Sequence, residues 1–289
     1  MIATGHRSAN EAASCLGPFD GPGHSLMSPP EEEEARTALS AFLAEAGPMV
    51  LGCAPAASCI GPAYEFAFEI DHLLRKRKMR YQVPIAFVTP EPFLRHFGGG
   101  GVGKARQFLE GEFDEQDIRY YISAAVSEIS ESSVALSDGM TFESQFSMVI
   151  PPLAGVDAIT NSPDVGNSKG FVPMGEQYRH TQVPSIYAVE VAVALPPVDE
   201  TAMPVNSPKA SHITEQMAVV AARNIAADVT GSDDESPRPL AVECILDMGD
   251  RAAHIKADPV RPPRNTAVLS EGRRWLWPSR SSSATTCGV

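Results

Sequence analysis

Residues 48–79 read PMVLGCAPAASCIGPAYEFAFEIDHLLRKRKM: a buried apolar run, a turn of small residues, then an amphipathic helical pattern. Strand, tight turn and helix in this order are typical of an α/β sheet. The alternation continues, because strand-like runs lie in 83–94 and 119–129 with a helical pattern between them in 104–118. The spacing therefore predicts a mostly parallel sheet covered by helices.

Segments on either side extend this alternation. A helix is predicted over 31–47, where glutamates fill the first turn and Gly47 ends it. The remaining expected elements are the end of a buried strand in MIATG, loop over 6–30 and 156–182, a hairpin and a strand ending at Pro151-Pro152, a buried strand over 185–197, a helix over 209–231, a polar linker over 232–239, and strand, turn and strand over 241–255. The tail from about Trp277 is polar and of low complexity, so we expect it to be disordered.

The composition is that of a globular protein. The chain has 289 residues, 43% of them apolar and 20% charged, and a net charge of −13. Such an acidic balance argues against binding nucleic acid and against purely electrostatic attachment to an anionic membrane. There is no apolar run of membrane-spanning length and no signal pattern after Met1, so the sequence predicts a soluble chain, in the cytoplasm.

The five cysteines are scattered and odd in number: Cys15, Cys53, Cys59, Cys244 and Cys287. No CxxC pair or zinc-ribbon spacing accompanies them, so no metal site is predicted. Cys59 follows a small-residue turn and precedes a helical pattern. It is either a small buried hydrophobe or a thiol whose thiolate is favoured by backbone N–H groups and the helix dipole.

Two stretches look like phosphate-binding loops but lack the residues that such loops need. At the place of a GxGxxG motif the chain has Gly52, Ala54 and Ala57, and the two alanines put a Cβ where the backbone has to approach a pyrophosphate. FGGGGVGKAR, residues 97–106, has no GK[ST] because Ala105 follows the lysine. We interpret this second stretch as a flexible loop over a cleft.

Seven stretches, in this order and at about the family's spacing, resemble the sulfide:quinone oxidoreductases, which are flavoproteins of the pyridine nucleotide-disulfide oxidoreductase superfamily related to flavocytochrome c sulfide dehydrogenase. They are MIATG, GPMVLG…ASCIGPAYEFAF, VTPEPFLRHFG…GVG, SMVIPPLAGVDAI, GFVPM, IYAVEVAVALPPVDETAMPV…SPK and CILDMGDRAAHI. The resemblance implies an FAD/NAD(P)-binding Rossmann-like fold with three layers, in which the first flavin-binding domain is incomplete.

The resemblance also implies an activity. Members of the family oxidise sulfide to sulfane sulfur or polysulfide through active-site cysteines and FAD, and pass the electrons to quinone. Cys59 and Cys244 match the redox pair, His96 matches a histidine on the quinone side, and Glu65 matches a glutamate on the helix after Cys59. The family's flavin contacts match Thr4, Gly5, Pro151, Pro152, Pro196 and Lys209, the last at the pyrimidine edge of the flavin.

The chain departs from the family pattern at several positions. Glu190 stands where the family has a glycine against the cofactor, Met27 where a third cysteine is expected, and Ser211 within a small-residue segment. The family's N-terminal pyrophosphate-binding motif and its C-terminal amphipathic, membrane-associated helices are not matched. We therefore expect a truncated chain, weakly active or inactive. The alternatives are a remnant that binds no FAD and a flavin-free carrier of sulfane sulfur.

The family resemblance also implies a division of the chain into domains. Residues 1–45 would be a remnant of the FAD-binding domain with a connecting helix, and 46–150 a second Rossmann-like domain. Residues 151–276 would hold the second half of the FAD-binding domain and the C-terminal strands, and 277–289 the tail. The sequence leaves the oligomeric state open.

Overall fold

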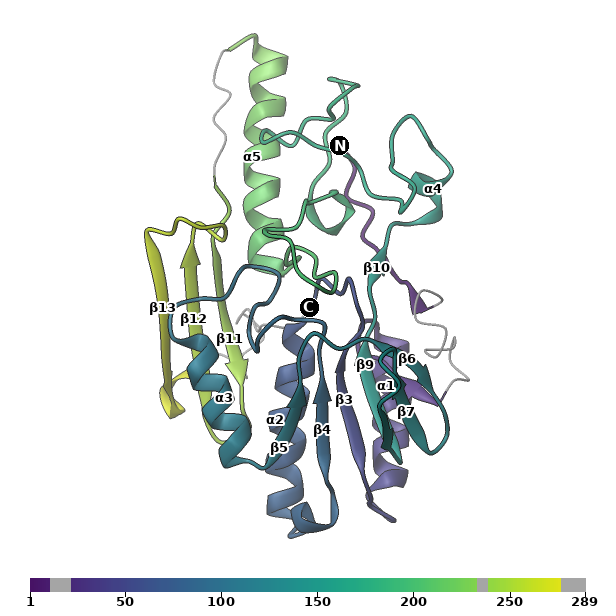
Figure 1. Ribbon diagram of the computed structural model, residues 1–289. Helices are drawn as coiled ribbons and strands as arrows, with labels where there is room; N and C mark the ends of the chain where they lie inside the picture. Colours follow the sequence, from purple (N-terminus) through teal and green to yellow (C-terminus); the bar gives the residue numbers. More distant parts are fainter. Residues whose placement is uncertain (11–21, 233–238, 277–289) are drawn as a thin grey trace.

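The computed structural model describes residues 1–10, 22–232 and 239–276. Its centre is a parallel sheet of five strands (Figure 1). In order across the sheet these are β2 (Gly23–His24), β9 (Phe146–Ile150), β3 (Met49–Cys53), β4 (Ile85–Val88) and β5 (Ile118–Tyr121). Every residue of β3 and β9 is buried, as expected for central parallel strands covered on both faces.

The sheet lies between two other layers. Three helices, α1 (Pro29–Phe42), α2 (Gly61–Lys76) and α3 (Ala105–Glu115), share one hydrophobic core with Leu51, Phe87 and Met148 of the sheet. The opposite face, with Val50 and Val149, packs against an antiparallel meander of β6 (Val126–Ile129), β7 (Ser133–Leu136) and β8 (Thr141–Glu143). This arrangement confirms the predicted α/β, three-layer, Rossmann-like class.

Gly52 allows β3 and β4 to approach closely. Its φ is +150°, and a Cβ at this position would lie 1.8 Å from the Val88 carbonyl oxygen. No other residue type fits without moving one of the two strands. The glycine that the sequence places at the start of a phosphate-loop-like stretch is therefore needed here for strand packing.

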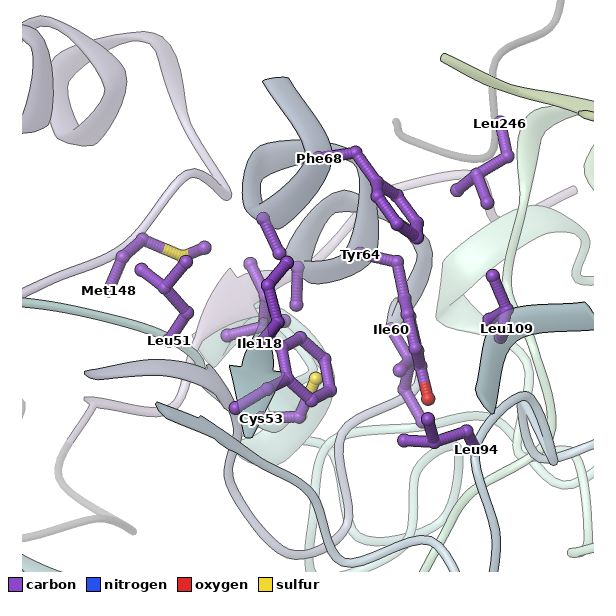
Figure 2. Close-up of a cluster of buried hydrophobic side chains, with 14 of the residues drawn as sticks. Leu51, Cys53, Ile60, Tyr64, Phe68, Leu94, Leu109, Ile118, Met148 and Leu246 are labelled. Carbon is purple, nitrogen blue, oxygen red and sulfur yellow. The ribbon is translucent and has the colours of Figure 1, made fainter. Parts of the chain in front are cut away.

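A second, antiparallel sheet stands beside α2 and α3 (Figure 1). It consists of β11 (Val242–Asp247), β12 (Ala252–Asp258) and β13 (Thr266–Gly272). The first two strands were expected, but β13 was not. Leu246 of β11 points toward Phe68 and Leu109 of the helices (Figure 2), and Arg251 forms an ion pair with Glu112 of α3.

The rest of the structure lies beyond the carboxyl ends of the parallel strands. It holds the long helix α5 (Ser211–Thr230), the short helix α4 (Asp157–Thr160) and the strand pair β1 (Arg7–Ser8) with β10 (Leu153–Ala154). None of the helices that the structure describes is both long and apolar enough to cross a membrane.

The expected strand over 185–197 is wrong. That stretch forms only isolated bridges, Ile2 with Ala188, Val172 with Val193 and Arg179 with Tyr187, around a 3₁₀ turn at Glu190–Ala192. Glu190 has φ +60°, which interrupts an extended chain. The buried strand end expected in MIATG is likewise reduced to the Ile2 bridge, and helix α1 ends five residues before Gly47.

Several expectations remain predictions. The tail from 277 and most of the polar linker, 233–238, lie outside the described residues. The domain boundaries at 45, 150 and 276 also stay predictions.

Candidate functional site

The carboxyl ends of neighbouring parallel strands lead into the segments that carry Cys59, His96 and the Pro151-Pro152 pair. The turn after β3 holds Cys59, the loop after β4 holds His96, and β9 ends directly before Pro151-Pro152. In open α/β sheets this edge is where ligands bind. The strand order brings the three segments together, although about 100 residues of sequence separate the first from the last.

Cys59 is a free thiol in the core, 5% exposed. Burial raises the pKa of this thiol to about 12, and the nearby carboxylate of Glu65 also raises it. Of the two interpretations of the turn cysteine, the environment favours the buried, protonated thiol over the thiolate stabilised by the helix dipole. Any reaction of Cys59 as a nucleophile therefore requires a change in its surroundings or a base.

Cys244 belongs to β11 and lies in the same hydrophobic core as Cys59. It is not a free thiol, whereas Cys59 is, so the two are not bonded to each other in this structure. Strand β11 runs along α2, where the Asp247 backbone N–H donates to Glu65 Oε1 at 3.2 Å. The fold thus brings two cysteines 185 positions apart in sequence into one core.

His96 is almost fully buried, and its Nε2 lies 3.0 Å from Asp199 Oδ2. Asp199 is half exposed, so this pair connects a buried imidazole with solvent. Phe93 contacts the ring edge-on at 5.3 Å. The geometry fits a group that moves a proton between the core and the surface.

A buried acidic network lies beside His96 and was missed by the sequence analysis. Glu91 accepts hydrogen bonds from the Tyr64 hydroxyl at 2.6 Å, the Thr89 hydroxyl at 2.8 Å and the Phe97 backbone N–H at 2.7 Å. Burial raises the pKa of Glu91, and the three donors oppose that rise. The Tyr64 side chain extends toward Leu94 in Figure 2. One signal in the sequence could have indicated this network: in the TPEP turn after β4, Glu91 is the single acidic residue of an otherwise buried segment.

Four of the six expected cofactor contacts meet around the first ten residues. The Gly5 backbone N–H donates to Glu190 Oε1 at 2.6 Å, next to exposed Thr4. The Ala9 backbone N–H donates to the Pro152 carbonyl oxygen at 2.9 Å, next to Pro151. Pro196 lies farther along, where its carbonyl oxygen accepts from the Ser207 hydroxyl at 2.6 Å.

Lys209 joins this region to the cysteine turn. Its backbone N–H donates to the Ser58 carbonyl oxygen at 3.3 Å, and its ammonium donates to the Val191 carbonyl oxygen at 2.7 Å. The ammonium also lies 3.6 Å from the centre of the Phe171 ring. Burial lowers the pKa of Lys209 to about 7, which Glu190 partly opposes.

The residues present fit a flavin at the lysine end of this region. The Lys209 ammonium makes one hydrogen bond within the described residues, which leaves N–H donors for the pyrimidine edge of a flavin. At the other end, the Glu190 carboxylate accepts a hydrogen bond from the Gly5 N–H, and its negative charge stands where the family resemblance implies a glycine against the cofactor. Glu190 also has a positive φ, the conformation that favours the glycine which the family pattern places there.

Comparisons with known proteins agree with this assembly. No family model matches the chain. The sulfide-quinone reductase of Aquifex aeolicus (strain VF5) is 36% identical over 246 residues, which make up 83% of this chain and 57% of that protein. The X-ray structure of the sulfide:quinone oxidoreductase from Aquifex aeolicus superposes with a TM-score of 0.85 at 32% identity, covering 88% of this chain and 61% of that one. The chain belongs to the sulfide:quinone oxidoreductase family.

The chain spans about three fifths of the length of each of these two relatives, so its membership rests on that part of their sequences. More distant structures share the fold alone. A ferredoxin reductase from Rhodopseudomonas palustris superposes with a TM-score of 0.53 at 18% identity. An NAD-dependent persulfide reductase from A. fulgidus gives 0.55 at 16%. The sulfide:quinone oxidoreductase family and the Rossmann-like fold predicted from the sequence are thus both confirmed.

Proposed function

We propose that this chain carries an FAD-dependent site that oxidises sulfide to sulfane sulfur or polysulfide and passes the electrons to a quinone. The observation that carries the proposal is the hydrogen bond from the Lys209 backbone N–H to the Ser58 carbonyl oxygen. It places the lysine expected at the flavin edge directly beside the turn that holds Cys59. In the overall reaction, sulfide loses two electrons, and the quinone takes up two electrons with two protons.

The cysteines would hold the sulfur. Cys59 and Cys244, in the same core, would form a disulfide in the oxidised site, and hydrosulfide would open it, leaving a persulfide on one cysteine and releasing the other as a thiolate. After the outer sulfur passes to a second nucleophile, oxidation of the two thiols back to the disulfide would release the two electrons that the quinone finally takes up. Since burial keeps Cys59 protonated, Glu65 is proposed to take up the thiol proton. His96 would carry protons between the core and Asp199 at the surface for the quinone.

FAD, when bound, supplies a two-electron acceptor. Lys209 would hold the pyrimidine edge, where its positive charge stabilises the negative charge of the reduced state. Thr4, Gly5, Pro151, Pro152 and Pro196 are proposed to line the cofactor. Because quinones are membrane-resident, the proposed acceptor implies contact with a membrane surface.

The first test is the visible spectrum of the purified chain with added FAD, recorded before and after sulfide. We expect a retained flavin band that bleaches with sulfide in the wild type and in Cys53→Ala, but not in Cys59→Ala. The two variants are matched, because each removes one buried free thiol. Equal bleaching in both would remove Cys59 from the reaction.

A second candidate function is favoured by Glu190. Its carboxylate accepts a hydrogen bond from the Gly5 N–H at 2.6 Å, which favours a chain that holds no FAD and whose paired thiols carry sulfane sulfur. Mass spectrometry after exposure to polysulfide distinguishes the two. A persulfide on Cys59 in protein that retains no flavin would support the carrier, whereas flavin retention would rule it out.

A further inference from the structure

Arg95 is a fully buried cation whose guanidinium has no hydrogen-bonded acceptor among the described residues. Its side chain is the largest of the completely buried ones, with an exposed fraction of 0%. Within the described part of the chain, Nε and both terminal nitrogens of its guanidinium have no hydrogen-bond partner. Burying a charged group is unfavourable unless the charge is paired and its donors are satisfied, so this position needs an explanation.

The backbone at Arg95 adds to this cost. Its φ is +70°, in the left-handed region that favours glycine. The backbone N–H is bonded, since it donates to the Tyr64 hydroxyl oxygen at 3.0 Å. A strained backbone and a buried charge at the same residue are retained where the side chain has a function.

Among the described residues, the groups around the guanidinium do not form hydrogen bonds with it. It lies over the Phe97 ring, with Cζ 4.5 Å from the ring centre, and that ring contacts Tyr64 edge-on. The Glu91 carboxylate interacts with it electrostatically, but forms its hydrogen bonds with Tyr64, Thr89 and Phe97 instead. Burial lowers the pKa of Arg95 to about 9, so the group is still a cation at neutral pH.

Arg95 also shares its surroundings with Cys59. The carboxylate of Glu65 interacts electrostatically with both side chains. Tyr64, whose hydroxyl contacts Arg95, lies on the first turns of the helix that follows Cys59. The segment that carries Arg95 and the helix that follows Cys59 thus meet at Tyr64.

We propose that the Arg95 guanidinium binds a small inorganic anion in the core, and that this anion is hydrosulfide or a short polysulfide approaching Cys59. The identity of the anion rests on the function proposed above. A guanidinium is less strongly hydrated than an ammonium and presents several donors in one plane, which suits a polarisable anion held over an aromatic ring.

The test uses the full chain without added flavin and measures thermal unfolding at constant ionic strength and with excess reductant. Sodium hydrosulfide and potassium thiocyanate are the probes, and chloride is the reference salt. An anion at about 100 times its Kd should raise the wild-type Tm by about 5 °C or more. Arg95→Gly should lose the anion-dependent rise, whereas its own Tm combines the relief of a buried charge with the cost of the cavity that the side chain leaves.

Two further variants separate binding from structure. Arg95→Lys keeps the charge without the planar donor set, so the anion-dependent rise should fall to less than half. Arg106→Gln removes an exposed arginine of the same region, paired with Glu110, and should leave both the Tm and the rise unchanged.

If Arg95→Gly does not fold, Arg95→Lys decides, and an undiminished anion-dependent rise in Arg95→Lys overturns the inference. It is also overturned if the anion-dependent rise survives in Arg95→Gly. A wild type that shows no rise but bleaches flavin with sulfide would remove the anion site and leave the proposed function standing. An anion-dependent rise in Tm without bleaching of flavin by sulfide would support the anion site and contradict the proposed function.

Discussion

Glu190 is the residue that we expect to oppose cofactor binding. Replacing it with glycine removes the carboxylate from the Gly5 N–H and relieves a positive φ. We expect Glu190→Gly to bind FAD at least about tenfold more tightly, which corresponds to about 1.4 kcal/mol. Quenching of flavin fluorescence in a titration measures the change.

Glu190→Gln is the matched control, because it keeps the shape of the side chain and removes only the charge. If the FAD affinity of Glu190→Gln lies between those of the wild type and Glu190→Gly, both the charge and the size of the Glu190 side chain oppose FAD binding. Unchanged affinity in both variants would show that this carboxylate does not face the cofactor.

Lys209 makes stability depend on pH. Its pKa in the folded state is about 7, below the ordinary value of 10.5 that we assign to the unfolded chain. Between these values the unfolded chain binds more protons, so the contribution of Lys209 to stability rises with pH, by at most about 1.4 kcal/mol per unit. In Lys209→Met this rise should be lost.

Urea unfolding of both proteins at pH 7, 8 and 9 checks this expectation. The free energy of unfolding of the wild type minus that of the variant should increase with pH. A constant difference would mean that the ammonium is not desolvated in the folded state.

At the scale of elements, the contact between β3 and β4 depends on Gly52. A Cβ 1.8 Å from the Val88 carbonyl oxygen forces the two central strands apart. Gly52→Ala should lower the free energy of unfolding by about 3 kcal/mol or more. Gly139→Ala, at an exposed turn with φ +92° and open space around it, should cost only about 1 kcal/mol. Equal losses in urea unfolding would contradict the packing role.

The elements also show what the sequence could predict. Parallel strands and amphipathic helices were found because their patterns are local, as in 48–79 and 104–118. The segment 185–197 has the apolar content of a strand, but a strand also needs neighbours, and only single bridges form there. At the site, Cys59, His96 and Lys209 followed from the family resemblance. Glu91 and Arg95 were missed, because both stand out only by their burial, Glu91 with three hydrogen-bond donors and the Arg95 guanidinium with no acceptor among the described residues. No sequence pattern records these features.

At the scale of the molecule, the first ten residues tie together segments that are far apart in the sequence. Ile2 exchanges backbone hydrogen bonds with Tyr187 and Val189, at 2.7 and 3.0 Å, and Ala9 donates to Pro152. Deleting residues 1–10 should therefore destabilise the region beyond the sheet by about 3 kcal/mol, at about 1 kcal/mol for each lost bond.

Limited proteolysis gives a local readout of this deletion. The peptide bonds of 185–195 should be cleaved faster in the deletion variant than in the full chain, while those of the parallel sheet keep their protection. Ala3→Ser, a change at an exposed position of the same segment, is the control and should leave the cleavage pattern as it is. Uniform loss of protection would mean that the whole molecule unfolds as one unit.

The strand order β2-β9-β3-β4-β5 places the last parallel strand between the first two. Among the strands that the structure describes, β2 pairs with β9 alone, which follows it by more than 120 residues. Helix α1 likewise packs Phe42 against Phe146 of β9. During translation we therefore expect the apolar face of α1 to stay partly uncovered until Ile150 has left the ribosome, which leaves it accessible to chaperones for that time.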